Sequence, residues 1–216
     1  EGLGVEVKTR WRWIGQDDGF LFETPDGPQR IQPDVTVLAC GGASWARLGS
    51  DGAWAGWIDT PLSPFQSANM GFLVDWYSHM AKHIGAPVKN VALQTGDQSI
   101  RGEFVVSATG LEGGGIYAVS RQMREGHELT LDLLPDLSEA EVRNRLAKPR
   151  GKASQSNHLR KAVRLDPVKQ ALLMEFGKPL PDNLAPLLKA LPVRHKGPRP
   201  MDQAISTVGG IKLYCL

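Results

Sequence analysis

The amino-acid pattern changes at Ser138, and this change constrains the fold more than any other feature of the chain. Upstream, short β-type segments alternate with turns, as in "GFLFET" at 19–24 and "HELTLDLLP" at 127–135. Downstream, Ser138 followed by Glu141 has the form of a capping box, and "DPVKQALLMEFG" at 166–177 begins and ends with helix signals. A run of strands followed by a separate group of helices indicates an α+β, multi-domain chain.

The two kinds of segment predict two substructures. Several strands at short spacing indicate a β-barrel or a strongly twisted antiparallel sheet. Four short helices with short links indicate a small helical bundle. A turn cluster is expected at 24–29 and a proline-rich boundary at 59–65. The expected strands are 5–14, 19–24, 31–39, 71–76, 88–95, 96–109, 127–135 and one after 204; the expected helices are 77–85, 114–126, 137–147, 156–164, 166–177 and 182–191.

The composition is that of an ordinary globular protein. The 216 residues are 41% hydrophobic and carry a net charge of +2, so the whole molecule is not an obvious partner for polyanions. No apolar run reaches the ~18–20 residues of a membrane span, and no signal segment opens the chain. The two cysteines, Cys40 and Cys215, lack the spacing of a zinc site. We therefore expect a cytoplasmic location, with no membrane and no metal site.

Common catalytic signatures are absent from the sequence. There is no G-x-G-x-x-G fingerprint, no phosphate-binding P-loop, no G-x-S-x-G elbow and no H-E-x-x-H motif. His79 and His83 have helical spacing and could supply two ligands, but no third ligand accompanies them. We expect them to be surface or half-buried histidines, and the sequence names no catalytic residue.

Two glycine pairs adjoin strand-like sequence and are candidates for a binding site. In "VTVLACGGASWARLGSDG", an apolar run at 35–39, typical of a strand covered on both faces, ends in Gly41 and Gly42. The second pair, Gly209 and Gly210, lies in "STVGGIKL". Glycines at such positions allow either a sharp turn or the close approach of a ligand to the backbone. The two pairs could form two walls of one site if the intervening chain is an insertion.

Two further segments could hold phosphate. The strand, glycine-rich turn and helix at 107–122 could bind an anion, but the lysine and hydroxyl of a nucleoside-triphosphate loop are missing, and a tight turn with close strand–helix packing explains the glycines better. Segment 143–164 carries eight lysines and arginines and no acidic residue, but it lacks aromatic residues for stacking on bases. A phosphate- or RNA-binding module using this basic segment is the alternative function, in competition with a solvated helical surface.

Several longer stretches resemble one family, the BaiN-like (YhiN-like) NAD(P)/FAD-dependent oxidoreductases. The resemblance rests on "VLACGGASWARLGSDG", "APVKNVAL", "RGEFVVSATGLEGGGIYAVS", "LTLDLLPDLSE", "KPRGKASQSNHLRKA" and "GPRPMDQAISTVGG". It implies a doubly wound FAD-binding domain interrupted by an insert that combines a β-barrel with a small helical bundle. The implied layout is a partial FAD-binding domain at 1–58, the barrel at 59–136 and 191–206, the bundle at 137–190, and a return strand at 207–216.

The resemblance also implies the cofactor and its contacts. The flavoprotein parent would bind FAD and accept electrons from NAD(P)H. The family's N-terminal glycine fingerprint and its C-terminal part are not in this sequence. We therefore expect an internal fragment whose partners are those missing FAD-domain segments, with no FAD in this chain and no activity alone; nucleic acid is not an expected partner. The cofactor-binding positions implied are Cys40, which replaces the family's usual threonine, and Gly41, Gly42, Ser44, Thr207, Gly209 and Gly210.

Overall fold

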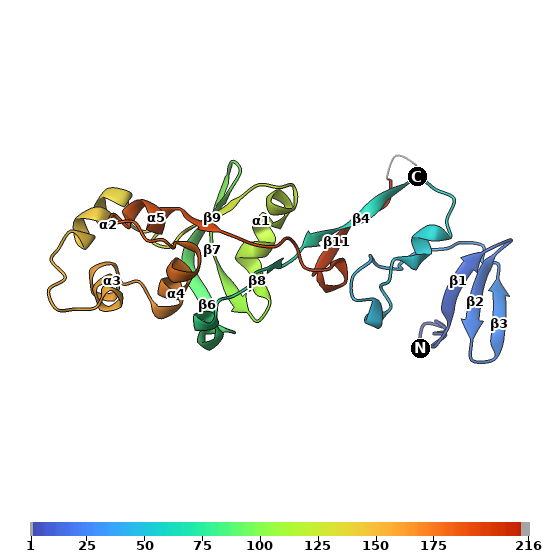
Figure 1. The fold of residues 1–216 in the computed structure, drawn as a ribbon. Coiled ribbons are helices and arrows are strands. Elements are labelled where there is room, and N and C mark those ends of the chain that lie inside the picture. Colours follow the sequence, from blue (N-terminus) through green and yellow to red (C-terminus); the bar gives the residue numbers. More distant parts are fainter. Residues whose placement is uncertain (1, 213–216) are drawn as a thin grey trace. The chain divides into compact units, whose positions relative to one another are not determined.

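The computed structural model describes residues 2–212 and divides the chain into two compact units (Figure 1). One unit comprises Glu1–Ser67 and Met201–Leu216, and the other comprises Ala68–Pro200. The larger second unit therefore lies between two segments of the first in the sequence. No helix among residues 2–212 is long and apolar enough to cross a membrane.

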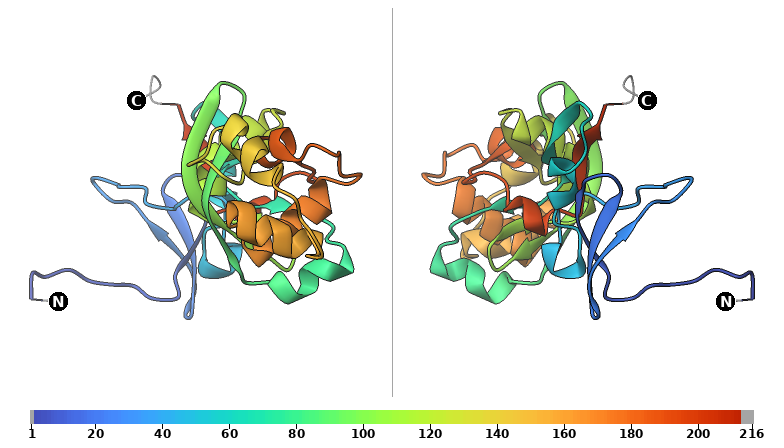
Figure 2. Two further views of the ribbon diagram at one scale, coloured as in Figure 1. Left: turned by 90° about the vertical axis from the view of Figure 1, so that its left-hand side faces the viewer. Right: turned by 90° about the vertical axis from the view of Figure 1, so that its right-hand side faces the viewer.

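A six-stranded antiparallel sheet forms the centre of the second unit. Its order is β10-β9-β6-β7-β8-β5, and the long hairpin of β6 and β7 gives it a curved shape (Figure 2). Within residues 2–212 the edge strands β10 and β5 do not pair with each other, and only an isolated bridge between Phe72 and Pro198 joins β5 to the segment after β10, so the predicted barrel is a half-barrel. The strands are β5 (Phe72–Leu73), β6 (Pro87–Thr95), β7 (Gln98–Ser107), β8 (Gly110–Glu112), β9 (Leu129–Asp132) and β10 (Leu191–Val193).

Helix α1 (Gly114–Arg124) packs directly on this sheet through glycine. A Cβ atom at Gly115 would lie 2.7 Å from the carbonyl oxygen of Glu103 and 3.0 Å from a methyl group of Leu93. Gly102 on β7 faces Gly115 across the same contact. Gly115, in the first turn of α1, thus has a packing role, because a side chain there would push the helix away from the strands.

Four short α-helices follow the strands, as the sequence predicts. The side chain of Ser138 accepts a hydrogen bond from the Glu141 N–H, and the Glu141 carboxylate accepts one from the Ser138 N–H, so the capping box is confirmed. Asp166 caps α4, with Pro167 in its first turn. Helix α2 packs against α3 and α5, and α3 packs against α4. The bounds are α2 (Glu139–Leu146), α3 (Gln155–Val163), α4 (Pro167–Phe176) and α5 (Ala185–Lys189). The expected helix at 77–85 is a 3-10 helix, η3 (Ser78–His83).

The first unit contains two small sheets. One has the order β1-β2-β3, and the other pairs β4 with β11. The prediction of a turn at 24–29 is wrong in part, because β3 begins at Gly27; Pro28 fits there because β3 is an edge strand and lacks one neighbour. The proline-rich stretch at 59–65 is largely strand, since β4 begins at Leu62, and the border between the two units follows at Ser67. The bounds are β1 (Arg12–Gln16), β2 (Phe20–Thr24), β3 (Gly27–Ile31), β4 (Leu62–Asn69) and β11 (Ser206–Ile211).

The predicted buried strand at 35–39 is not formed in the described part of the chain. Val35 is 83% exposed and Val37 is 86% exposed, and no strand pairs with this segment. A strand needs neighbours that satisfy its backbone N–H and C=O groups, and residues 2–212 place none beside it. The strand expected at 5–14 is also shorter, because β1 begins only at Arg12, where pairing with β2 begins.

Candidate functional site

The two glycine pairs lie in the same unit and contact each other's segments. The Ala43 N–H donates a hydrogen bond to Thr207 Oγ1 at 3.4 Å, across 164 positions of sequence. A Cβ atom at Gly42 would lie 1.9 Å from the same oxygen. Gly42 is therefore required by the contact between these segments, because any side chain would displace Thr207.

Trp54 joins the first glycine pair to the second. Its indole N–H donates to the Gly41 carbonyl at 3.2 Å, and its ring packs edge-on against Phe65 with centroids 5.8 Å apart. A Cβ atom at Gly209 would lie 2.5 Å from the Pro64 carbonyl oxygen, so Gly209 allows β11 to lie close to β4. Gly210, with φ of 102°, is buried beside the rings of Phe65 and Trp54. Trp54 and Phe65 are residues of this site that the motifs did not indicate.

The segment after the first glycine pair is held by Asp202. The Trp45 N–H donates to the Asp202 carbonyl at 3.0 Å, and the Ala46 N–H donates to its carboxylate at 2.7 Å. Trp45 itself has φ of 63°, a left-handed conformation that is uncommon for an aromatic residue. Asp202 therefore compensates part of the cost of this turn, and it too was missed because its partners are more than 150 positions away in the sequence.

The remaining predicted positions differ in exposure. Ser44 is buried, Gly41 is exposed, and Cys40 is half-buried. Burial raises the pKa of the Cys40 thiol, so the neutral thiol is favoured and the residue is not an activated nucleophile. The second cysteine, Cys215, lies outside the described residues.

An apolar groove of about 320 Å³ adjoins Cys40 in this unit. Aromatic side chains of β1 and β2, including Trp13 and Phe20, line one part of it, and the exposed run around Val37 lines another. The rings of Trp13 and Phe20 pack with centroids 5.5 Å apart. The lining residues at 35–40 immediately precede Gly41 in the sequence, so the groove ends next to the first glycine pair.

The basic segment 143–164 does not form one continuous stripe. Arg143 pairs with Glu139 on α2, Arg160 lines a cavity with His79 and His83, and Arg145 and Arg164 line a separate cavity with Lys169. The positive charges of this segment are thus distributed over several separate surfaces of the second unit.

The two histidines with helical spacing do not form a metal centre in the described part of the chain. His79 Nε2 lies 3.3 Å from the Ala171 carbonyl oxygen and 3.4 Å from the buried carboxylate of Glu175. Partial burial and the neighbouring Lys82 lower the pKa of His83. Among residues 2–212, no group of three or more His, Cys, Asp or Glu side chains could hold a metal ion.

Comparison with known proteins assigns the family. Residues 66–206 match the family described as "HI0933-like protein barrel and H2TH domain". The chain therefore belongs to the HI0933-like flavoprotein family, and the family indicated by its sequence motifs is confirmed.

One curated relative is an enzyme. Over 138 residues the chain is 32% identical to 3-dehydro-bile acid delta(4,6)-reductase from Clostridium scindens, in an alignment that covers 58% of this chain and 33% of the relative. The chain thus spans about a third of the length of this relative.

Proposed function

We propose that this chain is part of an FAD-dependent oxidoreductase and that segments 40–44 and 207–210 contribute one wall of its FAD site. The observation that carries the proposal is the contact between Ala43 and Thr207, which joins two glycine-containing segments far apart in the sequence. Family membership supports the flavin, and the activity stated in the name of the relative supports a reductase.

The chemistry of this wall fits FAD. Segment 40–50 has no acidic side chain of its own and includes Arg47, which favours an anion such as the pyrophosphate of a dinucleotide; the Asp202 carboxylate beside it is engaged by the Ala46 N–H. The exposed backbone at Gly41 allows close approach, and the hydroxyl of Thr207 lies beside the next residue, Gly42. The glycines also have a packing role of their own, so their presence alone does not carry the assignment.

The residues of this chain would bind and orient the cofactor. Bound FAD supplies hydride chemistry. Exposed Gly41 would let it lie against the backbone, Thr207 would offer a hydroxyl group, and the Cys40 thiol would pack as a small neutral group. Gly42, Gly209, Gly210 and the buried Ser44 would support this wall from within, because protein atoms already occupy the space beside the three glycines. We further propose NAD(P)H as the electron donor and FAD-domain segments beyond this sequence as the other wall. On this proposal, the chain alone is inactive.

An FAD titration tests the proposal. FAD is added to the chain of 216 residues and, in parallel, to the complete protein encoded by the same gene, and binding is followed by flavin fluorescence and absorbance. We expect the complete protein to bind and the shorter chain to bind weakly or not at all, because its sequence has no G-x-G-x-x-G turn for the pyrophosphate.

Two alanine variants of the complete protein locate the site. Gly41 and Gly49 are both exposed and have φ of 71° and 96°, so alanine imposes backbone strain at either position. We expect Gly41→Ala to weaken FAD binding and Gly49→Ala to serve as the control for left-handed backbone strain; a Cβ atom at Gly41 would in addition lie 2.9 Å from the Ser50 hydroxyl, whereas one at Gly49 meets no atom within 4 Å. A complete protein that never binds flavin would refute the proposed function, and equal losses in the two variants would refute the assigned wall.

A further inference from the structure

A cavity of about 490 Å³ in the second unit has an unusual concentration of positive charge. It is lined by Arg145 of α2, Arg164 at the end of α3 and Lys169 of α4. Asn90 and Asp136 complete its polar lining. Every lining residue belongs to the second unit, so the cavity is separate from the proposed FAD wall.

Lys169 supplies a buried cation to the wall of this cavity. The residue is only 6% exposed, and its ammonium donates to the carbonyls of Asn90 at 2.8 Å and Leu133 at 2.9 Å. An ammonium group has three N–H donors, so two carbonyls leave one donor for a further acceptor. Burial lowers the pKa of Lys169, while the carboxylates of Asp166, Asp132 and Asp136 act in the opposite direction.

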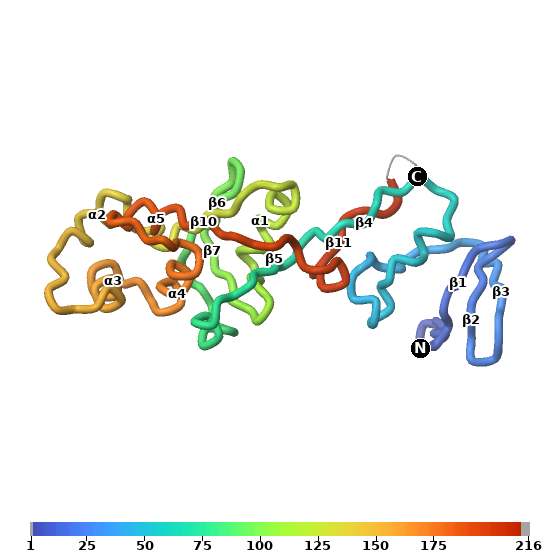
Figure 3. The backbone as a smooth tube through the Cα atoms, viewed as in Figure 1, coloured from blue at the N-terminus to red at the C-terminus, as the bar shows by residue number. Residues whose placement is uncertain are grey.

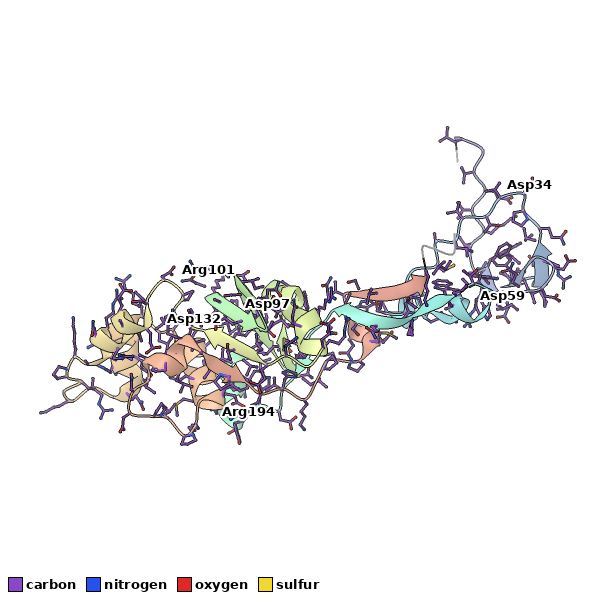
Figure 4. The ribbon with its side chains drawn as sticks, turned by 90° about the horizontal axis from the view of Figure 1, so that it is seen from above. Asp34, Asp59, Asp97, Arg101, Asp132 and Arg194 are labelled. Atoms are coloured by element: carbon purple, nitrogen blue, oxygen red, sulfur yellow. The ribbon has the colours of Figure 1, made fainter. Side chains whose placement is uncertain are left out.

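The two arginines are not neutralised by ion pairs. Within residues 2–212 neither Arg145 nor Arg164 forms a salt bridge, although Arg145 contributes to the lowered pKa of Glu141. Asp136 is the acidic residue among those that line the cavity. Its carboxylate accepts hydrogen bonds from the guanidinium of Arg101, labelled in Figure 4, and from the side-chain amide of Asn90. Among the residues that line the cavity, three cations therefore accompany one carboxylate, so the lining carries a net positive charge, while Asp132 and Asp166 act on Lys169 from outside the lining.

The backbone at Arg164 points to a role for its side chain. Arg164 follows α3 with φ of 56°, and its N–H donates to the Leu159 carbonyl, which ends the helix. Glycine or asparagine usually occupies this left-handed position, because a Cβ atom is unfavourable there. An arginine has no advantage over glycine at this helix end, and this exposed arginine is one of the residues that line the cavity.

We propose that this cavity binds a phosphate group of a small anionic ligand. Two guanidinium groups offer planar pairs of N–H donors that match phosphate oxygens, and the buried ammonium offers a further donor. Three cations suit a dianionic phosphate better than a monovalent carboxylate. This inference does not depend on FAD binding in the other unit.

Calorimetric titration with inorganic pyrophosphate tests the proposal on the chain of 216 residues. We expect saturable binding that Arg145→Gln and Arg164→Gly each weaken about tenfold or more, as for the loss of a hydrogen bond to a charged group. Arg164→Gly keeps the fold testable because glycine suits the backbone at this position. Lys161→Gln, an exposed charge on the same helix that does not line the cavity, is the control and should leave the affinity unchanged.

Several results would overturn the proposal. Absence of saturable pyrophosphate binding would do so, as would an equal loss of affinity in the Lys161→Gln control. Tighter binding of citrate than of pyrophosphate would assign the cavity to carboxylates instead. Binding of a single-stranded RNA oligonucleotide without binding of pyrophosphate would assign the charges to a nucleic-acid surface.

Discussion

Replacement of Lys169 by methionine should destabilise the second unit by about 2–3 kcal/mol. Methionine retains most of the buried aliphatic stem but leaves two carbonyls without their donor. The Leu133 carbonyl belongs to a fully buried residue, and an unsatisfied buried acceptor costs about 1–3 kcal/mol. The Asn90 carbonyl belongs to an exposed residue, so water replaces part of its lost bond. Removal of the desolvated charge of Lys169 offsets some of this cost, so the expected loss is at the lower end of the summed cost of two unsatisfied carbonyls.

The pH dependence of this loss has a definite sign. Burial lowers the pKa of Lys169 in the folded chain below its ordinary value of 10.5. Between the folded-state pKa and 10.5, the unfolded chain therefore binds more protons at this residue, and stability rises with pH. Below both values the residue is charged in both states and contributes no pH dependence. The stability difference between wild type and Lys169→Met should thus grow as pH approaches 10.5.

Urea unfolding of the wild type and the variant at pH 7 and at about pH 10 measures this difference. Lys161→Met, which removes an exposed charge from α3, is the control and should change stability by less than about 0.5 kcal/mol at both pH values. A Lys169→Met variant as stable as the wild type would refute the role of the ammonium in holding the two carbonyls. A difference that shrinks with rising pH would refute the direction of its pKa shift.

Two further predictions concern local contacts. Gly42→Ala should cost about 2 kcal/mol in thermal denaturation, because its Cβ would collide with Thr207 Oγ1. Adding Thr207→Ala should recover part of the loss, since the Thr207 Cβ would remain 3.3 Å away; a purely additive double variant would contradict the collision. Ser138→Ala should cost about 1 kcal/mol in urea unfolding by removing the cap of α2. An unchanged midpoint would contradict that capping role.

Local signals in the sequence predicted the helices well because the chemistry of a helix end is local. The caps at Ser138 and Asp166 depend on residues three positions away, so both could be recognised before the fold was known. The edge strand at Gly27 was missed because its proline and glycine are typical of a turn. The apolar run at 35–39 has the composition of a strand, but a strand forms only where neighbouring strands pair with it, and none does so here among residues 2–212. Strand formation depends on pairing with another segment, and the residues of a segment do not show whether such a partner lies beside it.

The candidate site was predictable only in outline. The motifs indicated Gly41, Gly42 and Thr207, and in the fold Thr207 contacts Gly42 and Ala43. The reason for Gly42 could not be predicted, because the oxygen that excludes its side chain is 165 positions away. Lys169 was missed for the same reason: its two carbonyl partners lie 79 and 36 positions away, and nothing in a helical lysine signals burial.

The two ends of the second unit are joined by its own backbone. The Leu73 N–H donates to the Gly197 carbonyl at 2.9 Å, and the Arg199 N–H donates to the Gly71 carbonyl at 2.9 Å, so the entering and leaving segments run side by side (Figure 3). A flexible loop of roughly a hundred residues or more would cost the surrounding fold about 4 kcal/mol in closure entropy. Here the inserted unit closes that loop by itself. A host domain can therefore gain, lose or exchange such a unit with little entropic penalty, which makes the point of insertion a natural site for grafting one domain into another.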